Sequence, residues 1–485
     1  MDSRGYSRRD FLKAAGIGAA AVAFPGCAGS AGRPGSRRLA EKPNIILIMA
    51  DDLGYGHLGC YGQKLIRTPH LDRMSREGMR FTQAYAGCTV CAPSRSVLMT
   101  GLHTGHTPVR GNSGGIPLHE GDVTVAEVLK SAGYTTGLFG KWGLGEHGTS
   151  GIPNKQGFDE FFGYLHQIHA HFYYPEYLWK NDEKYPLPGN ADGKQSQYTH
   201  DEIVEQALGF IRANRRGPFF AYLAFAIPHY ELLVPEDSLR EYRGKFPETP
   251  YTGRGRPAGY PHDYGKQETP KAAIAAMITR MDRNIGRLLT LLEELGIDED
   301  TVVLFTSDNG PSRGQGDPDF FKAAGPLRGY KGSLYEGGIR VPLIARRPGR
   351  IRAGAVSEQV CYFADVMPTL AELAGTEGPE NTDGISIVPT LLGSETVGRK
   401  QQQHRFGYWE YKGRAAVRMG RYKALRRRGG EPLEIYDLAG DIGETRNIAA
   451  RRRDVVAIIE NYLKNARTEP RPQIEPEKPE GRQYR

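Results

Sequence analysis

Residues 43–54, PNIILIMADDLG, form an unbroken apolar run that ends abruptly in two acids. Such a run is typical of a strand buried on both faces of a parallel sheet. Residues 301–310, TVVLFTSDNG, repeat the pattern. Sites in open α/β sheets form beyond the carboxyl ends of the strands, so we expect four polar side chains to meet there: Asp51, Asp52, Asp308 and Asn309.

Either polar pair alone would suit a helix cap or a turn, but the repetition at two strand ends favours a shared site. Carboxylates crowded together repel one another unless a cation holds them. An all-oxygen set of ligands favours Ca²⁺ or Mg²⁺ over softer metals. The two strands therefore predict a metal site.

Outward from these strands, the pattern predicts an α/β fold, with a large, mostly parallel mixed sheet sandwiched by helices. We place this main domain at 43–380 and expect a long helix over 272–296, where apolar residues recur at helical spacing. A small C-terminal α+β subdomain is predicted at 381–466, with an antiparallel sheet and then a helix near 450–466. Residues 467–485, rich in proline and charge, are predicted to be a flexible tail. The alternating runs that predict the small sheet are 406–411, 415–425 and 433–438.

Composition limits the class of protein. The 485 residues have a mean hydropathy of −0.52 and 25% charged residues, which excludes an integral membrane protein, a collagen-like chain and a disordered chain. The net charge is +8, but residues 1–42 hold eight Lys and Arg against three acids and so carry +5 of it. The remaining charge is too small to indicate a surface that binds nucleic acid. The basic cluster at 421–428 alternates with apolar residues, as on the solvated face of a strand.

The N-terminus predicts export. SRRDFLK at 7–13 precedes thirteen uncharged residues, a run too short to span a bilayer, and matches a twin-arginine export signal. We assign this signal to 1–27 and a linker to 28–42, which makes the twin-arginine translocase a partner and the location periplasmic or extracytoplasmic. Cys27 offers lipid anchoring as an alternative, the one membrane contact that we expect, and cleavage among residues 28–31 competes with it.

A short helix should begin near the motif CTVCAPSRSVLMTG at 88–101, bracketed by Pro93 and Gly101. Cys91 then lies at the helix N-terminus, where backbone N–H groups favour negative charge, and Arg95 follows one turn later on the same side. The C-x-x-C spacing also suits a redox pair or half a zinc site. A partner motif for zinc is missing from the sequence.

C-x-P-S-R followed by T-G resembles the signature of the type I, formylglycine-dependent sulfatases, an arylsulfatase-like family of the alkaline-phosphatase-like superfamily. The resemblance runs from about residue 43 to the 460s, and its landmarks keep the family's order. These landmarks are GKWGLG at 140–145, PH at 228–229, GYKGSLYEGG at 329–338, DVMPTL at 365–370 and EIYDL at 434–438.

This resemblance implies a sulfuric ester hydrolase whose catalytic domain is 43–380. Its substrate would be a sulfated small molecule or glycan, either a sulfated carbohydrate or an aryl sulfate. It implies that a formylglycine-generating enzyme oxidises Cys91 to formylglycine, whose hydrate attacks sulfur. Modified Cys91 would join Asp51, Asp52, Asp308 and Asn309 in holding the metal, with Ca²⁺ favoured over Mg²⁺.

The family pattern also assigns the cations. Arg95 would hold the aldehyde hydrate, while Lys141 and Lys331 would bind sulfate oxygens. His229 would bind sulfate too and donate a proton to the leaving alcohol. Fixed positive charge of this kind stabilises the transition state where negative charge develops.

One departure is important. The family's motif is G-K-W-H-L-G, and its histidine takes a proton from the hydrate, but this chain has Gly143 there. His147 and His171 are our candidates for the sulfate site, although a packed or surface histidine is an alternative for each. Two other functions stay open: a phosphonate or phosphodiester hydrolase on the same fold, and a non-catalytic binding relative.

Overall fold

The computed structural model describes residues 42–112, 116–253 and 264–472. The predicted export signal, Cys27 and almost all of the predicted linker lie outside these ranges. Among the helices that the structure describes, none combines the length and apolarity needed to cross a bilayer.

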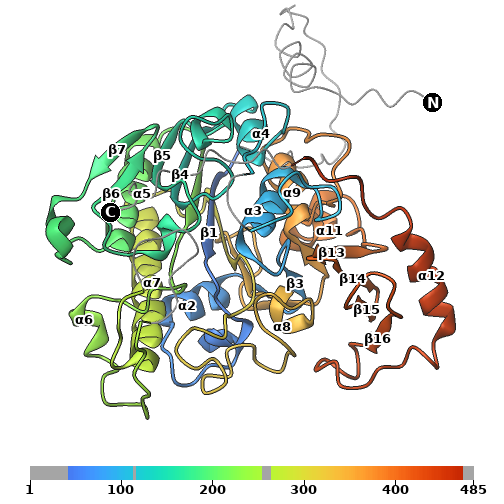
Figure 1. Cartoon of the computed structure of the whole chain (residues 1–485). Coiled ribbons are helices and arrows are strands. Elements are labelled where there is room, and N and C mark those ends of the chain that lie inside the picture. The colour runs from blue at the N-terminus through green and yellow to red at the C-terminus, as the bar shows by residue number, and fades with distance from the viewer. Residues whose placement is uncertain (1–41, 113–115, 254–263, 473–485) are drawn as a thin grey trace, which may run out of the picture.

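A ten-stranded mixed sheet forms the centre of the molecule (Figure 1). In spatial order its strands are β11 (Ala355–Ser357), β2 (Met79–Phe81), β10 (Leu343–Arg346), β9 (Thr301–Ser307), β1 (Asn44–Ala50), β8 (Phe219–Ala224), β4 (Thr135–Lys141), β5 (Glu160–Tyr164), β6 (Tyr177–Lys180) and β7 (Glu183–Pro186).

The five central strands, β9 to β5 in that order, are mutually parallel. The flanking pairs β10–β9, β10–β2, β5–β6 and β6–β7 are antiparallel. The two apolar runs that begin at residues 43 and 301 are neighbouring strands, with Ala50 opposite Ser307. The acids that follow them therefore meet at one edge of the sheet, as expected.

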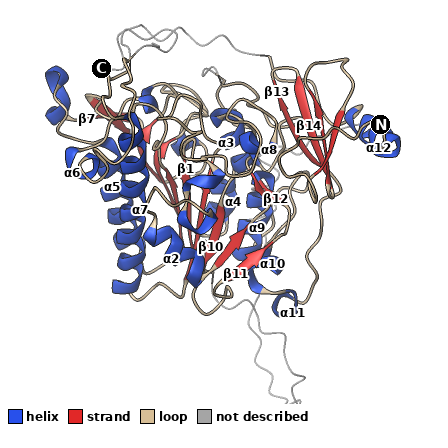
Figure 2. Cartoon of the chain, turned by 90° about the horizontal axis from the view of Figure 1, so that it is seen from below, coloured by secondary structure: helices blue, strands red, loops and turns tan. Residues whose placement is uncertain are grey.

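Helices cover both faces of the sheet (Figures 1 and 2). Side chains of β1 alternate between the faces, so Leu47 packs into one core layer and Ile46 into the other. The Leu47 layer contains α3 (Cys91–Thr100), α4 (Val125–Ser131) and α9 (Val366–Leu373). The Ile46 layer contains α2 (Pro69–Glu77), α5 (Thr199–Asn214) and α7 (Pro270–Glu294). The predicted α/β sandwich and its long helix near 272–296 are confirmed.

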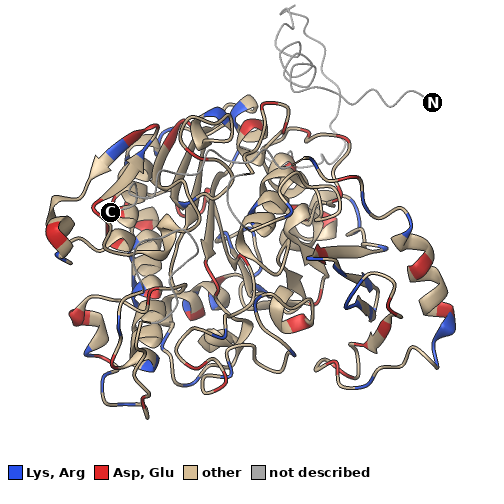
Figure 3. Ribbon diagram, viewed as in Figure 1, with Lys and Arg blue, Asp and Glu red and all other residues tan. Residues whose placement is uncertain are grey.

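A second, four-stranded antiparallel sheet lies at the C-terminal side, with α12 (Arg453–Leu463) packed on it. Its strands are β13 (Gly407–Tyr411), β14 (Arg414–Met419), β15 (Tyr422–Arg426) and β16 (Glu434–Asp437). The expected run 415–425 is two strands, because Gly420 has a φ of +56° and turns the chain between them. In the basic cluster, Arg421 and Arg426 pair with acids of β16 and α12, so both signs of charge lie side by side there (Figure 3).

The shorter elements connect these layers. They are β3 (Ala84–Tyr85), β12 (Cys361–Tyr362), α6 (Glu236–Leu239), α8 (Glu336–Ile339), α10 (Val388–Leu392), α11 (Ser394–Val397) and the 3₁₀ turns η1 (Tyr55–His57), η2 (Gly59–Tyr61), η3 (Pro153–Lys155), η4 (His169–His171), η5 (Pro188–Gly193) and η6 (Phe363–Asp365).

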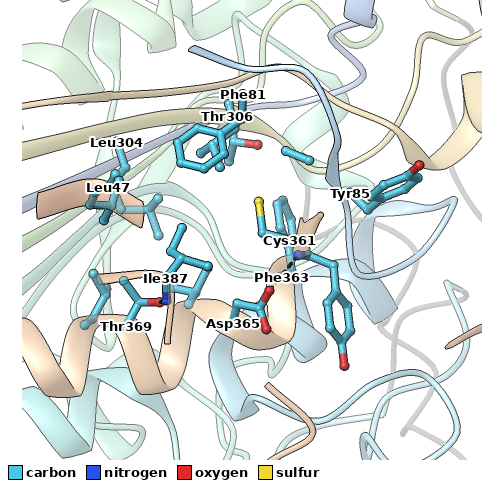
Figure 4. Close-up of a pocket in the computed structure, with 16 residues that line it drawn as sticks. Leu47, Phe81, Tyr85, Leu304, Thr306, Cys361, Phe363, Asp365, Thr369 and Ile387 are labelled. Atoms are coloured by element: carbon cyan, nitrogen blue, oxygen red, sulfur yellow. Dashed lines mark hydrogen bonds between the residues drawn. The ribbon is translucent and has the colours of Figure 1, made fainter. Parts of the chain in front are cut away.

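A small cavity of about 40 Å³ remains between the sheet and α9 (Figure 4). Its sheet side is lined by Leu47, Phe81 and Thr306, and its helix side includes Thr369. Thr306 Oγ1 is buried, and within the described residues it has no hydrogen-bond partner. The cavity is therefore an apolar packing defect with one unsatisfied hydroxyl on its wall.

Candidate active site

The carboxyl ends of β1 and β9 bring Asp51, Asp52, Asp308 and Asn309 together, all of them fully buried. The Asp52 backbone N–H donates to Asp308 Oδ1 at 3.0 Å, and Asn309 Nδ2 donates to Asp52 Oδ1 at 2.7 Å. The positive φ of Asp52, +63°, turns the chain sharply after the strand. The predicted meeting of the two strand ends is thus present.

Helix α3 begins at Cys91, whose neighbours explain the C-x-P-S-R pattern. Asn112 Oδ1 accepts from the Ala92 N–H at 2.9 Å and satisfies one free donor of the first turn. Ser94 Oγ donates to the Asp308 carbonyl at 2.5 Å and ties the helix to the end of β9. Gly101, with a φ of +69°, ends the helix. The helix N-terminus is therefore fixed against the acidic edge of the sheet.

The Cys91 thiol lies inside the cluster, 3.4 Å from Asp51 Oδ1 and 3.2 Å from Lys331 Nζ. Burial, followed by the charge of Asp51, raises the pKa of this thiol. Cys88, the other half of the C-x-x-C, is a free buried thiol whose Sγ lies 3.7 Å from the Glu410 carbonyl. The unmodified Cys91 is consequently a neutral thiol.

Three cations face the carboxylates. Arg95 donates to Asp308 Oδ2 at 2.8 Å and to the Lys141 carbonyl at 2.7 Å. Lys141 Nζ pairs with Asp51 Oδ2 at 2.5 Å, and both side chains are fully buried. Lys331 Nζ pairs with Asp52 Oδ1 at 2.6 Å and retains 15% exposure, so it lies toward solvent. Three carboxylates and three cations thus balance in formal charge.

The charged neighbours of each group in the cluster shift its pKa in different directions. Burial alone would raise the pKa of Asp51, but Lys141, His229 and Arg95 hold that pKa well below its usual value. For Asp308, burial and the Asp51 charge outweigh Arg95 and raise the pKa to about 7. Burial would lower the pKa of Lys331, but the neighbouring Asp52 raises it well above its usual value.

His229 and His171 border the cluster. His229 Nε2 is 3.5 Å from Asp52 Oδ2, and burial together with the Lys331 charge lowers the His229 pKa well below its usual value. The His171 ring lies 4.3 Å from the His229 ring between centroids, and its Nδ1 is 2.7 Å from the Tyr264 hydroxyl. Burial, then the charges of His229 and Lys141, lowers the His171 pKa.

His147 has different neighbours. Its side chain is 57% exposed, its Nδ1 pairs with Asp182 at 2.8 Å, and its ring stacks on Trp179 of β6. The structure therefore places His147 outside the buried cluster. Its closeness in sequence to Gly143 does not bring it into the buried cluster.

Sequence reasoning missed Gln167, a buried side chain that packs directly against Gly143. The signal lay in the stretch QIHAH at 167–171, from which only His171 was chosen. Glutamine carries no charge and its contact with Gly143 is tertiary, so the sequence pattern alone does not single it out.

The cluster has the donors that a hard cation requires. Asp52 Oδ2 and Asn309 Oδ1 are buried and find no hydrogen-bond partner among the described residues. Ligand atoms of Asp51, Asp52, Cys91 and His229 lie within 4.8 Å of one another. Unpartnered buried oxygens at the meeting point of three carboxylates fit an oxygen-ligated divalent cation.

Known proteins share this architecture over most of the chain. Residues 43–376 match the family described as Sulfatase, residues 330–469 match "N-sulphoglucosamine sulphohydrolase, C-terminal", and residues 5–25 match the twin-arginine translocation signal. The last match indicates export beyond the cytoplasm and makes the twin-arginine translocase a partner.

Similar proteins include arylsulfatase A of Homo sapiens, 35% identical with 84% of each chain covered. N-acetylgalactosamine-6-sulfatase of Rattus norvegicus is 33% identical, with 79% of this chain and 71% of that protein covered. The crystal structure of Ps i-CgsB in complex with k-i-k-neocarrahexaose superposes with a TM-score of 0.72 at 27% identity, over 87% of this chain and 92% of that one.

The matched region contains both strand ends, α3 and the Lys331 loop, so the likeness includes the cluster itself as well as the sheet. We conclude that the chain belongs to the sulfatase family and is an arylsulfatase-like hydrolase of sulfate esters.

Proposed function

We propose that this sulfatase removes sulfate from a sulfated carbohydrate, using a formylglycine made from Cys91 and a Ca²⁺ ion. The observation that carries the proposal is the position of Cys91, which lies at a helix N-terminus between Asp51 and Lys331 Nζ. One of the similar proteins is named N-acetylgalactosamine-6-sulfatase, and another was solved in complex with k-i-k-neocarrahexaose. Both names support a sugar substrate over a simple aryl sulfate.

Charge supports an anionic substrate. The cluster is formally neutral as described above, so a bound divalent cation would make it positive and ready to accept a sulfate ester. We infer that Asp51, Asp52, Asp308 and Asn309 hold the cation together with modified residue 91. Ca²⁺ would supply Lewis-acid stabilisation of negative charge on the reacting sulfate, and formylglycine hydrate would supply a nucleophilic hydroxyl.

The chain's own residues supply the remaining functions. The ammonium groups of Lys141 and Lys331 now pair with Asp51 and Asp52, and they can turn toward sulfate oxygens once a cation occupies the carboxylates. Arg95 is fixed by the Asp308 carboxylate and the Lys141 carbonyl, so its guanidinium orients the nucleophile without rearranging. His229 would protonate the oxygen of the leaving alcohol, and the negative charge of a bound sulfate ester would favour the protonated imidazole that this step requires.

We also propose that His171 lines the sulfate site. Its Nδ1 is occupied by the Tyr264 hydroxyl, which leaves Nε2 available, and its ring packs beside His229. Location is a further part of the proposal: the mature enzyme acts in the periplasm, with lipid anchoring at Cys27 as the alternative to a released form.

The first test is the mass of the residue-91 peptide from protein made in a host that matures sulfatases. An aldehyde there, with release of sulfate from sulfated oligosaccharides, supports the proposal. Cys91→Ala should abolish turnover, whereas the matched Cys60→Ser, a half-buried thiol elsewhere, should retain it.

An unmodified thiol in that competent host contradicts the formylglycine mechanism and favours a binding relative. Faster turnover of phosphate diesters or phosphonates than of any sulfate ester would instead indicate the phosphonate or phosphodiester hydrolase, because the same cations suit both anions. Turnover of aryl sulfates alone would contradict the carbohydrate assignment.

A further inference from the structure

Gln167 fills the space that a side chain at position 143 would need. Gln167 is only 4% exposed. A Cβ built on Gly143 would lie 2.4 Å from Gln167 Nε2 and 2.7 Å from its Cδ, which is closer than any real contact. A larger residue at 143 would therefore require the end of the Gln167 side chain to move from its present position.

Both residues lie at the edge of the sheet that carries the cluster. The two segments continue to pair past the end of β4. The Trp142 N–H donates to the Tyr164 carbonyl at 2.9 Å, and the Gly143 N–H donates to the Leu165 carbonyl at 3.0 Å. Lys141, two residues before Gly143, reaches Asp51. Gln167 is held beside this junction, so its amide belongs to the same edge as the proposed sulfate-binding cations.

The Gln167 side chain has an unused donor. Its Nε2 is buried, and in the part of the chain that the structure describes it finds no hydrogen-bond acceptor. Most buried polar groups in native proteins have a hydrogen-bond partner, so the free Gln167 donor calls for a partner that lies outside the protein chain, and an oxygen of a bound ligand would satisfy it. A sulfate group offers oxygens that only accept hydrogen bonds, which matches a free N–H.

We propose that the Gln167 amide donates a hydrogen bond to an oxygen of the bound sulfate group, from the position where the family carries its histidine. This inference rests on the proposed function. A side-chain amide neither takes up nor releases a proton near neutral pH, so the exchange converts a proton-transferring position into a binding position. Any base for the second step must come from another residue.

The first experiment compares Gln167→Ala with Gln156→Ala in calcium-loaded, formylglycine-containing protein. Gln156 is a matched control, since it is fully buried between β4 and β5 but donates to the carbonyls of Ser150 and His119. Gln167→Ala should lower kcat/KM and weaken binding of inorganic sulfate, each about 10- to 100-fold, as expected for a lost hydrogen bond to a charged group. Gln156→Ala should change both less than threefold, while lowering the unfolding midpoint.

The second experiment exchanges the two positions. Gly143→His alone should lose activity, because its side chain collides with Gln167. The double variant Gly143→His/Gln167→Gly makes room for the imidazole and should recover at least tenfold over Gly143→His. A histidine tolerates the positive φ of Gly143, +76°, better than most residues do.

The outcomes separate the two proposals. If the wild type binds inorganic sulfate and Gln167→Ala binds it equally well, the role of Gln167 is overturned while the sulfate site stands. The same holds if the double variant folds but is no more active than Gly143→His. Wild-type protein that binds no inorganic sulfate overturns the sulfate site itself, and the Gln167 assignment with it. Circular dichroism and the unfolding midpoint identify any variant that fails to fold, and Gln167→Met, of similar volume, then replaces Gln167→Ala.

Discussion

Replacing Lys423 by methionine would test how the C-terminal sheet supports the loop that carries Lys331. Lys423 lies on β15, and its Nζ forms ion pairs with Glu336 Oε1 at 2.9 Å and Glu444 Oε1 at 3.0 Å. All three side chains are fully buried. Glu444 also accepts from the Glu336 N–H at 2.7 Å, so the three residues hold α8, five residues after Lys331, against the second sheet.

Methionine keeps most of the volume and removes the charge, leaving two buried carboxylates facing each other. Breaking a buried ion pair by removing one partner costs about 3–5 kcal/mol, and we expect that loss in the free energy of unfolding at pH 8. Burial would raise the pKa of Glu336, but Lys423, Arg340 and Arg418 hold it at about 2. Burial already raises the pKa of Glu444 in spite of Lys423, and removal of the ammonium would raise that pKa further above its value in the unfolded chain, about 4.3.

The sign of the pH dependence follows. A folded state with a raised carboxyl pKa binds more protons than the unfolded state, so its stability falls as pH rises from about 4 through the raised pKa. The deficit of Lys423→Met relative to wild type should therefore be smaller at pH 5 than at pH 8. Urea unfolding followed by tryptophan fluorescence measures both values, and Lys464→Met, an exposed lysine of the same subdomain, is the control. A deficit below 1 kcal/mol at pH 8, or one that is equal at both pH values, would refute this reasoning.

Three further predictions concern the rest of the chain. Asp282→Ala should lower the free energy of unfolding by about 1–2 kcal/mol in urea titrations. Asp282 on α7 accepts a hydrogen bond from the Leu71 N–H at 2.7 Å and so caps the start of α2. An unchanged free energy of unfolding would contradict that capping role. Thr306→Val should raise the unfolding free energy by about 1 kcal/mol, since it removes the unsatisfied hydroxyl at the cavity wall with little change in shape; a loss of stability would mean that a water molecule satisfies that hydroxyl. Calcium at 100 times its Kd should stabilise the protein by about 2.7 kcal/mol over chelator-treated protein in thermal or urea unfolding, and Asn309→Ala should reduce this increment; an unchanged increment in Asn309→Ala would remove Asn309 from the metal site.

Local patterns predicted much of the fold and the cluster. The apolar runs that end in acids predict two buried strands whose acids meet at one edge of the sheet, and the structure shows that these strands, β1 and β9, are also direct neighbours. The bracket of Pro93 and Gly101 predicts α3 to within two residues of its observed bounds. Both inferences depend on short-range signals that a single sequence contains.

Features made by distant contacts were out of reach. The role that we propose for Gln167 depends on its contact with Gly143, which is 24 positions earlier in the sequence. Only the folded β4–β5 junction brings the two residues together. In the sequence, Lys423 is one of several charged residues in a basic strand. In the structure it is fully buried, because two glutamates from other segments form ion pairs with it. His147 is close to Gly143 in sequence, yet its exposed side chain pairs with Asp182 outside the buried cluster.

The Lys423 ion pairs have a consequence for the order in which a newly made chain becomes active. The thiol that we propose to be oxidised is at residue 91, but the ammonium beside it comes from residue 331, and the residues that hold that loop are 423 and 444. A ribosome must therefore synthesise more than 440 residues before all of these contacts can form. If Cys91 is modified as proposed, the modifying enzyme would act on a chain whose Cys91 is not yet enclosed by these later residues.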